Sequence, residues 1–138
     1  MSGLEVLGAF ASAVQLASTC LEITAFAIDL FSRVRGTPEA VKKRIAEIEQ
    51  LIQITRLIEH NPSLQTTLIA SVLSTCHGDA AQLLQILRKI DTQAPAGKVV
   101  KYWKALEGVI KERTILAICG RLQEKKASLT LCIASINV

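Results

Sequence analysis

The chain has few of the residues that end helices and strands, with only seven glycines and three prolines among 138 residues. Aromatic residues make up 4% of the chain although half of it is hydrophobic, so the apolar content is mostly leucine, isoleucine, alanine and valine. Few turns favour a small number of long elements over many short ones. A chain of this length has room for one domain that buries roughly two thirds of its unfolded surface. We therefore expect a single domain over residues 1–138.

Motifs typical of enzymes are also absent. The sequence has no phosphate-binding Gly-Lys loop, no dinucleotide-binding glycine fingerprint and no Gly-x-Ser-x-Gly nucleophile turn. Cys76 and His77 are adjacent, and adjacent residues on a helix point about 100° apart, so they cannot readily share a metal or form a catalytic dyad. We predict that the protein is not an enzyme and has no catalytic residue, metal site, cofactor or small-molecule substrate.

The four cysteines are far apart, and each lies in an apolar helical run: Cys20, Cys76, Cys119 and Cys132. This spacing favours buried free thiols in a reducing compartment over a disulfide framework. The N-terminus lacks the basic residues of a signal peptide, and Glu5 directly precedes the apolar stretch. We therefore expect no export.

Charge is distributed unevenly along the chain. Residues 1–32 contain three of the 12 acidic residues and no lysine or arginine, so they carry −3, whereas the remaining chain carries +7. A basic body can approach an acidic membrane surface or nucleic acid. The basic residues are spread over several segments without a recognition-helix signature, so we expect no nucleic-acid partner.

Hydrophobic residues recur with a helical period along the chain. The first segment, 3–35, is apolar nearly all round, a property of core helices and of membrane-competent helices, and Gly36 is its expected end. In the second segment Thr37 is the expected cap and Pro38 suits the first turn. The apolar face of this segment consists of Val41, Ile45, Ile48, Leu51, Ile52, Thr55 and Ile58.

The third segment is expected to open at a second cap-and-proline sequence, Asn61-Pro62-Ser63. Its apolar residues alternate spacings of four and three, as in a bundle seam: Ile69, Leu73, Cys76, Ala80, Leu83, Leu87 and Ile90. A loop over 93–97 and a shorter segment over 98–110 precede the last segment, about 112–136. The apolar face of that last segment consists of Ile115, Ile118, Leu122, Leu129, Cys132 and Ile136.

These patterns predict an all-α fold, a helical bundle of four long helices and one shorter helix with short connections. We expect the hydrophobic N-terminal helix, 1–35, to pack partly against the seam of the third and last segments. Residues 37–138 would then form the body of the bundle.

The N-terminal segment is nearly long enough to span a bilayer without a charge. Val6 to Leu21 is uncharged, and extension to Ile28 reaches a spanning length with Glu22 inside it. The candidate membrane-active residues are Val6, Leu7, Phe10, Val14, Leu16, Leu21, Glu22, Ile23, Phe26 and Ile28. The nine apolar residues favour insertion by about 3 to 5 kcal/mol, and Glu22 opposes it by about 2.5 to 3.5 kcal/mol. For a single helix these two contributions to the free energy of insertion nearly cancel. We therefore expect membrane activity from an assembly in which Glu22 faces a shared polar lumen.

Two further patterns accompany this helix. A row of small residues lets helices approach closely, which fits a bundle core or an association face in a membrane: Gly8, Ala9, Ala13 and Ala17. A basic cluster follows the helix, and each charge near an anionic leaflet contributes about 1 kcal/mol to binding: Arg33, Arg35, Lys42, Lys43 and Arg44. A solvated helix face is the alternative interpretation of the cluster.

Four stretches carry a family resemblance: Met1–Leu16, Asn61-Pro62-Ser63-Leu64-Gln65, Lys101-Tyr102-Trp103-Lys104-Ala105-Leu106 and Leu129-Thr130-Leu131-Cys132-Ile133. With them the chain resembles, over nearly its whole length, the N-terminal domains of fungal NOD-like receptors that carry NACHT or other P-loop NTPase modules. The resemblance is to the SesA type within the HeLo-like group. The matching stretches are helix-packing patterns rather than catalytic motifs.

The resemblance implies a helical-bundle effector that executes regulated cell death in non-self recognition, heterokaryon incompatibility and innate immunity. In that group, activation and oligomerisation release the N-terminal helix, which permeabilises the plasma membrane. The implied partners are an anionic membrane surface, further copies of the chain, and a NACHT or NTPase receptor in cis or in trans. The implied location is cytoplasmic at rest and the plasma membrane on activation.

The NTPase region of such a receptor is not part of this sequence, so we expect either an excised domain or a stand-alone relative. The alternative function is a non-catalytic interaction module that recruits partner bundles by helix–helix contact, without membrane activity of its own.

Overall fold

The computed structural model describes residues 3–32, 39–93 and 110–136. These residues form four long α-helices and one short 3-10 turn: α1 (Gly3–Ser32), α2 (Glu39–Glu59), η1 (Pro62–Leu64), α3 (Thr67–Gln93) and α5 (Ile110–Ile136). The described residues contain no strand. This confirms the predicted all-α bundle with a hydrophobic N-terminal helix. The expected cap at Thr37 and nearly all of the expected shorter helix over 98–110 lie outside the described residues.

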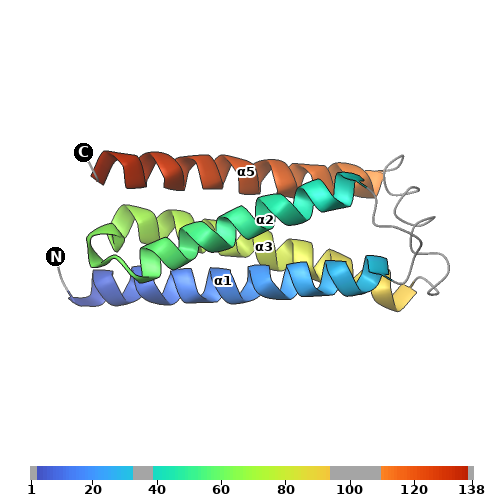
Figure 1. Ribbon diagram of the computed structural model, residues 1–138, viewed down its shortest axis with the longest axis horizontal. Helices are drawn as coiled ribbons and strands as arrows, with labels where there is room; N and C mark the ends of the chain where they lie inside the picture. The colour runs from blue at the N-terminus through green and yellow to red at the C-terminus, as the bar shows by residue number, and fades with distance from the viewer. Residues whose placement is uncertain (1–2, 33–38, 94–109, 137–138) are drawn as a thin grey trace.

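Consecutive helices run in opposite directions along one long axis (Figure 1). The most extensive contact is between α1 and α3, followed by α1 with α2 and α3 with α5, and α2 and α5 share a smaller one. Little direct contact joins α2 to α3 or α1 to α5 within the described ranges. The helices therefore surround one core in the order α1, α3, α5, α2, and α1 and α3 are parallel neighbours.

The neighbours of α1 differ in part from the prediction. Its expected contact with α3 is present, but its second partner is α2 rather than α5. The chain from Ser32 to Glu39 is short and allows α2 to return as an antiparallel neighbour of α1. A short connection does not require this, because α2 and α3 are also joined by a short turn and make little direct contact. That position beside α1 is filled by α2.

The core is built from the apolar faces that the helical period predicts. In α3 every predicted seam residue with a described side chain is buried: Ile69, Leu73, Cys76, Ala80, Leu83 and Leu87. In α2 the buried set is Ile48, Leu51, Ile52, Thr55 and Ile58. In α5 the buried members of the predicted face are Ile118, Leu122 and Leu129, whereas Cys132 is half-buried and Ile136 is exposed. The core joins all four helices.

The start of α3 differs from the prediction. Pro62 does not open α3 but begins η1, and α3 starts only at Thr67. Thr66 caps α3, because its Oγ1 accepts a hydrogen bond of 3.2 Å from the backbone N–H of Ile69. The proline therefore marks a turn, and the cap lies four residues after it.

The physical reason for this turn is the side chain of Gln65, which is buried. Its Nε2 donates to the carbonyl oxygens of Ile58 and Glu59, at distances of 3.1 and 3.3 Å. These carbonyls belong to the last turn of α2, where helical partners are missing. Gln65 thus satisfies the end of α2 and holds the chain in the turn before α3 begins.

Candidate functional site

The helix α1 has one buried face and one exposed face, although its sequence is apolar nearly all round. The buried face consists mainly of small and medium-sized side chains: Ala9, Ala13, Leu16, Ala17, Cys20, Ile23, Thr24 and Ala27. One flank of this face, about 100° around the helix from its centre, keeps four large apolar side chains between 42 and 52% exposed: Phe10, Val14, Leu21 and Ile28. At 3.6 residues per turn these four lie within a strip about 40° wide. We call them the exposed stripe.

The stretch Gly8–Asp29 of α1 is long and apolar enough to cross a membrane by length and composition. The core helix of a soluble protein meets the same criterion, but such a helix is mostly buried. In α1 only 39% of the apolar window is buried inside the bundle. This helix therefore combines a core-facing side with an apolar surface.

The predicted membrane-active residues are divided between these two sides. Leu16 and Ile23 are buried in the core, and Phe26 is half-buried. Glu22 is also exposed, about 100° around the helix from the stripe. The backbone of Val6 and Leu7 is part of α1, but their side chains lie outside those described. Since Leu16 is fully buried, a charge at this position would disrupt the bundle itself, and variants that probe membrane contact belong on the stripe.

The predicted small-residue row is also divided. Ala9 and Ala13 are fully buried, and Ala17 is nearly so. Gly8 is exposed, and nothing lies within 4 Å of the position that a Cβ atom would occupy there. Within this monomer the three alanines face the interior and Gly8 takes no part in the packing.

Enlarging the central alanine should destabilise the bundle. Ala13→Leu adds three carbon atoms where no side-chain surface is exposed, and overpacking of this kind costs about 1–3 kcal/mol. The matched control is Ala11→Leu, two residues away on the exposed side of α1, which should change the free energy of unfolding by less than about 0.5 kcal/mol. Urea denaturation followed by circular dichroism measures both. Equal stability of the two variants would show that Ala13 does not lie at a tight contact.

Polar contacts also join α1 to α3. His77 Nε2 lies 3.1 Å from Thr19 Oγ1. The Arg88 guanidinium donates through Nη2 to Glu22 Oε2 at 2.9 Å. The two members of this ion pair are 57 and 54% exposed, so it contributes about 0–1 kcal/mol. Glu22, predicted as the charge that opposes insertion, is therefore paired with Arg88 in the bundle.

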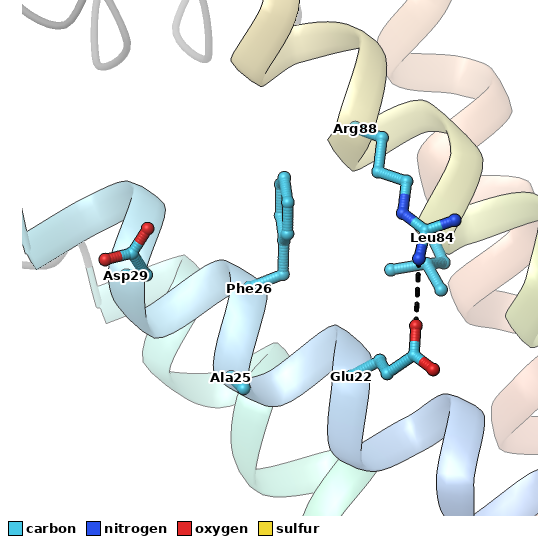
Figure 2. Close-up of a pocket in the computed structure, with 6 residues that line it drawn as sticks. All are labelled: Glu22, Ala25, Phe26, Asp29, Leu84 and Arg88. Atoms are coloured by element: carbon cyan, nitrogen blue, oxygen red, sulfur yellow. Dashed lines mark hydrogen bonds and ion pairs between the residues drawn. The ribbon is translucent and has the colours of Figure 1, made fainter.

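A shallow pocket of about 320 Å³ lies beside this ion pair, between α1 and α3 (Figure 2). Its lining residues are Glu22, Ala25, Phe26, Asp29, Leu84 and Arg88. In Figure 2 the ring of Phe26 stands between the two helices, and the Arg88 side chain reaches from α3 to the Glu22 carboxylate. The pocket thus has an apolar wall next to a charged rim. No group of three or more His, Cys, Asp or Glu within the described ranges could hold a metal ion.

The structure describes three members of the predicted basic cluster, all near the start of α2. Lys42 pairs with Glu39 at 3.4 Å, and Arg44 pairs with Glu47 at 3.1 Å. Lys43 is exposed. The other two predicted members, Arg33 and Arg35, lie outside the described residues.

Two further basic residues belong to the same end of the bundle. The start of α2 and the end of α3 lie at one end of the long axis (Figure 1), and Arg88 and Lys89 are on the last turns of α3. Both are exposed. Sequence reasoning missed them because they are more than 40 positions away from Lys42–Arg44, and only the folding of the chain brings them to this end.

All four cysteines are free, as predicted, but only three of the four are buried: Cys20, Cys76 and Cys119, whereas Cys132 is half-buried. Burial, with a smaller contribution from the neighbouring Cys76, raises the pKa of Cys20 to about 12. Burial is also the main cause that raises the pKa of Cys76 to about 12, with a smaller contribution from Asp79. Cys20 belongs to α1 and Cys76 to α3, so this pair reports on the contact between these helices.

The Cys20 and Cys76 thiols should resist alkylation in the folded bundle. With a pKa of about 12, roughly one thiol in ten thousand is ionised at pH 8, against about a tenth of ordinary cysteines. We expect N-ethylmaleimide to modify half-buried Cys132 at least about 100-fold faster, as measured by peptide mass spectrometry. The folded state holds these protons more firmly than the unfolded chain, so their contribution to stability is complete below about pH 9 and falls as the pH rises toward 12. Similar alkylation rates at all cysteines would contradict this packing.

Comparisons of the chain with protein-family models, with curated proteins and with solved structures each find no match. The functional interpretation therefore rests on the residues and the geometry of α1 and its neighbours.

Proposed function

We propose that this protein is a cell-death effector domain that targets and permeabilises the plasma membrane through α1. One observation carries the proposal: a helix long enough to span a bilayer keeps a stripe of large apolar side chains on the surface. Eight large hydrophobic side chains are exposed in the described part of the chain, and four of them are on α1. Soluble proteins normally cover such a helix, so the uncovered stripe favours contact with lipid. The cell-death role comes from the sequence resemblance.

The side chains that hold α1 favour its release, although its contact with α3 is the most extensive in the bundle. Its buried face is mostly alanine and cysteine rather than large aliphatic residues, so each position loses less buried apolar area on detachment than a leucine or isoleucine would. The ion pair that joins it to α3 is exposed and weak. A helix held in this way can be exchanged from the bundle to a membrane more easily than an ordinary core helix.

The charge distribution favours one orientation on the membrane. Residues 1–32 contain no lysine or arginine, whereas basic residues gather at the end of the bundle where α1 ends and α2 begins. Basic flanks stay on the cytoplasmic side of a membrane, and anionic lipids attract them. In this proposal the N-terminus of α1 crosses the bilayer, Lys42, Lys43 and Arg44 remain at the inner surface, and several copies assemble so that Glu22 faces a shared polar lumen.

Vesicle leakage tests the proposal. The purified chain should release a trapped dye from vesicles of phosphatidylcholine and phosphatidylglycerol, and much less from vesicles of phosphatidylcholine alone. In fungal cells a fluorescently tagged chain should move to the plasma membrane as the cells die. Cell death without relocation, together with intact vesicles, would contradict membrane permeabilisation.

A second candidate function is helix–helix recruitment of a partner, without membrane activity. It is favoured by the spacing of Val14, Leu21 and Ile28, which are seven residues apart, as at one position of a heptad seam. Small exposed residues at Ser18 and Ala25 would let a partner helix approach closely. Intact vesicles combined with cross-linking of α1 to a partner helix would select this function.

A further inference from the structure

The ion pair between Glu22 and Arg88 joins the helix proposed to leave the bundle to a helix that stays behind (Figure 2). Both side chains are more than half exposed, so solutes reach the pair from solution. Exposed pairs of this kind contribute about 0–1 kcal/mol. A competing anion can therefore displace the Glu22 carboxylate from the guanidinium at small cost.

The surroundings of Arg88 suit the phosphate of a lipid. A guanidinium presents a planar fork of donors that binds phosphate with two parallel hydrogen bonds. Beside it, Ala25, Phe26 and Leu84 give the pocket an apolar wall that can contact the glycerol and acyl part of a lipid. The pocket also contains the Asp29 carboxylate, which opposes a lipid phosphate as much as a free one, so the choice between them comes from the apolar wall. The combination favours a phospholipid presented by an anionic surface over soluble phosphate.

We infer that Arg88 exchanges Glu22 for the phosphate of an anionic phospholipid, and that this exchange loosens α1 from α3 at the membrane surface. The inference rests on the proposed function, for which it names a contact that changes partner as α1 leaves the bundle. At about 0–1 kcal/mol the ion pair assists this step and does not by itself hold α1 in place. In solution Arg88 stays with Glu22 and the bundle is closed. At the membrane the same guanidinium binds lipid, and α1 loses an ionic contact where lipid is available to receive its stripe.

Vesicle binding tests the exchange, because the two partners of the pair predict opposite effects. Glu22→Gln frees Arg88 and should tighten binding to phosphatidylcholine–phosphatidylglycerol vesicles about 5-fold, and Arg88→Gln should weaken it about 5-fold, since one basic charge at an anionic surface is worth about this factor. Both variants break the pair, so a purely structural role would move binding in the same direction in both. Co-sedimentation at fixed ionic strength gives the affinities.

Matched controls make the same charge changes on exposed parts of α2 away from the pair. Glu49→Gln and Arg56→Gln should each change vesicle affinity less than about 2-fold, because charges far from the membrane contact are screened. In the Glu22→Gln background, Arg88→Gln should cost more affinity than in the wild type, where Arg88 first has to leave Glu22. The exchange would be overturned if Glu22→Gln and Arg88→Gln changed vesicle affinity no more than the control variants do. It would also be overturned if the effect of Arg88→Gln were the same in the wild type and in the Glu22→Gln background.

Competition with inorganic phosphate tests whether Arg88 binds the phosphate of a lipid or a free phosphate ion. Added at constant ionic strength, it should reduce vesicle binding of the wild type no more than chloride does. A specific reduction that Arg88→Gln abolishes would overturn the lipid assignment in favour of a soluble anion. If the wild type binds vesicles without leakage, permeabilisation fails, whereas the opposite effects of Glu22→Gln and Arg88→Gln on affinity still decide the exchange.

Discussion

Leu21→Glu should reduce vesicle leakage by about two orders of magnitude while the bundle stays folded. Leu21 is 45% exposed in the middle of the exposed stripe, so the closed form tolerates a charge there, with a change of less than about 0.5 kcal/mol in the free energy of unfolding. Insertion does not tolerate it. A second acidic residue next to Glu22 near the middle of a spanning helix costs about 2.5 to 3.5 kcal/mol, which corresponds to a factor of roughly 100.

The matched control is Leu57→Glu on α2. Leu57 is also 45% exposed, so the two variants change surface chemistry and folding stability equally. Only the variant on α1 should lose leakage in the dye-release assay and killing in fungal cells. Full activity of Leu21→Glu, or equal loss in both variants, would exclude α1 as the membrane-active element.

Neutralising the basic cluster should weaken docking on anionic vesicles without changing the fold. Replacing Lys42, Lys43 and Arg44 together by glutamine removes three charges near the start of α2, each worth about 1 kcal/mol at the membrane surface. The affinity should fall by up to about two orders of magnitude. Because Lys42 and Arg44 already pair with acidic neighbours, we expect the loss of affinity to be smaller than two orders of magnitude. Screening shortens the range of these charges, so the loss should shrink as salt increases.

The control for this variant removes three positive charges elsewhere, by replacing Arg56, Lys125 and Lys126 with glutamine. These residues lie farther along α2 and α5, away from the end where α2 begins. Vesicle co-sedimentation at low and high salt compares the two triple variants. Equal weakening by both would mean that net charge, rather than this end of the bundle, controls docking.

The elements that could be predicted from sequence are those in which the pattern is local. Along α3 the alternation of spacings of four and three places Leu73, Cys76 and Ala80 on one side of the helix, and burying that side needs no information about its partner. The same holds for Ile48, Ile52 and the rest of the face of α2. The all-α fold and most of the core residues could therefore be predicted from the helical spacing of apolar residues.

Features that depend on distant residues could not be predicted. The late start of α3 depends on Gln65, whose amide reaches back to the end of α2, and no local pattern distinguishes it from an exposed glutamine. His77 and Thr19 are 58 positions apart, and Arg88 and Glu22 are 66 positions apart. The sequence pattern of α1 did not tell which of its apolar residues remain outside, because a helix that is apolar all round has no preferred face. Its exposed side is decided by where α2 and α3 pack.

The most direct test follows the alkylation of Cys20 and Cys76 while the chain is mixed with dye-filled anionic vesicles. Both thiols are fully buried where α1 joins the core of the bundle, so N-ethylmaleimide should reach them only when α1 leaves α3. Release of α1 predicts slow labelling in solution and with phosphatidylcholine vesicles, and rapid labelling that begins together with dye release from vesicles containing phosphatidylglycerol. Dye release while both thiols remain protected would show that the closed bundle acts on the membrane, and would contradict the release of α1.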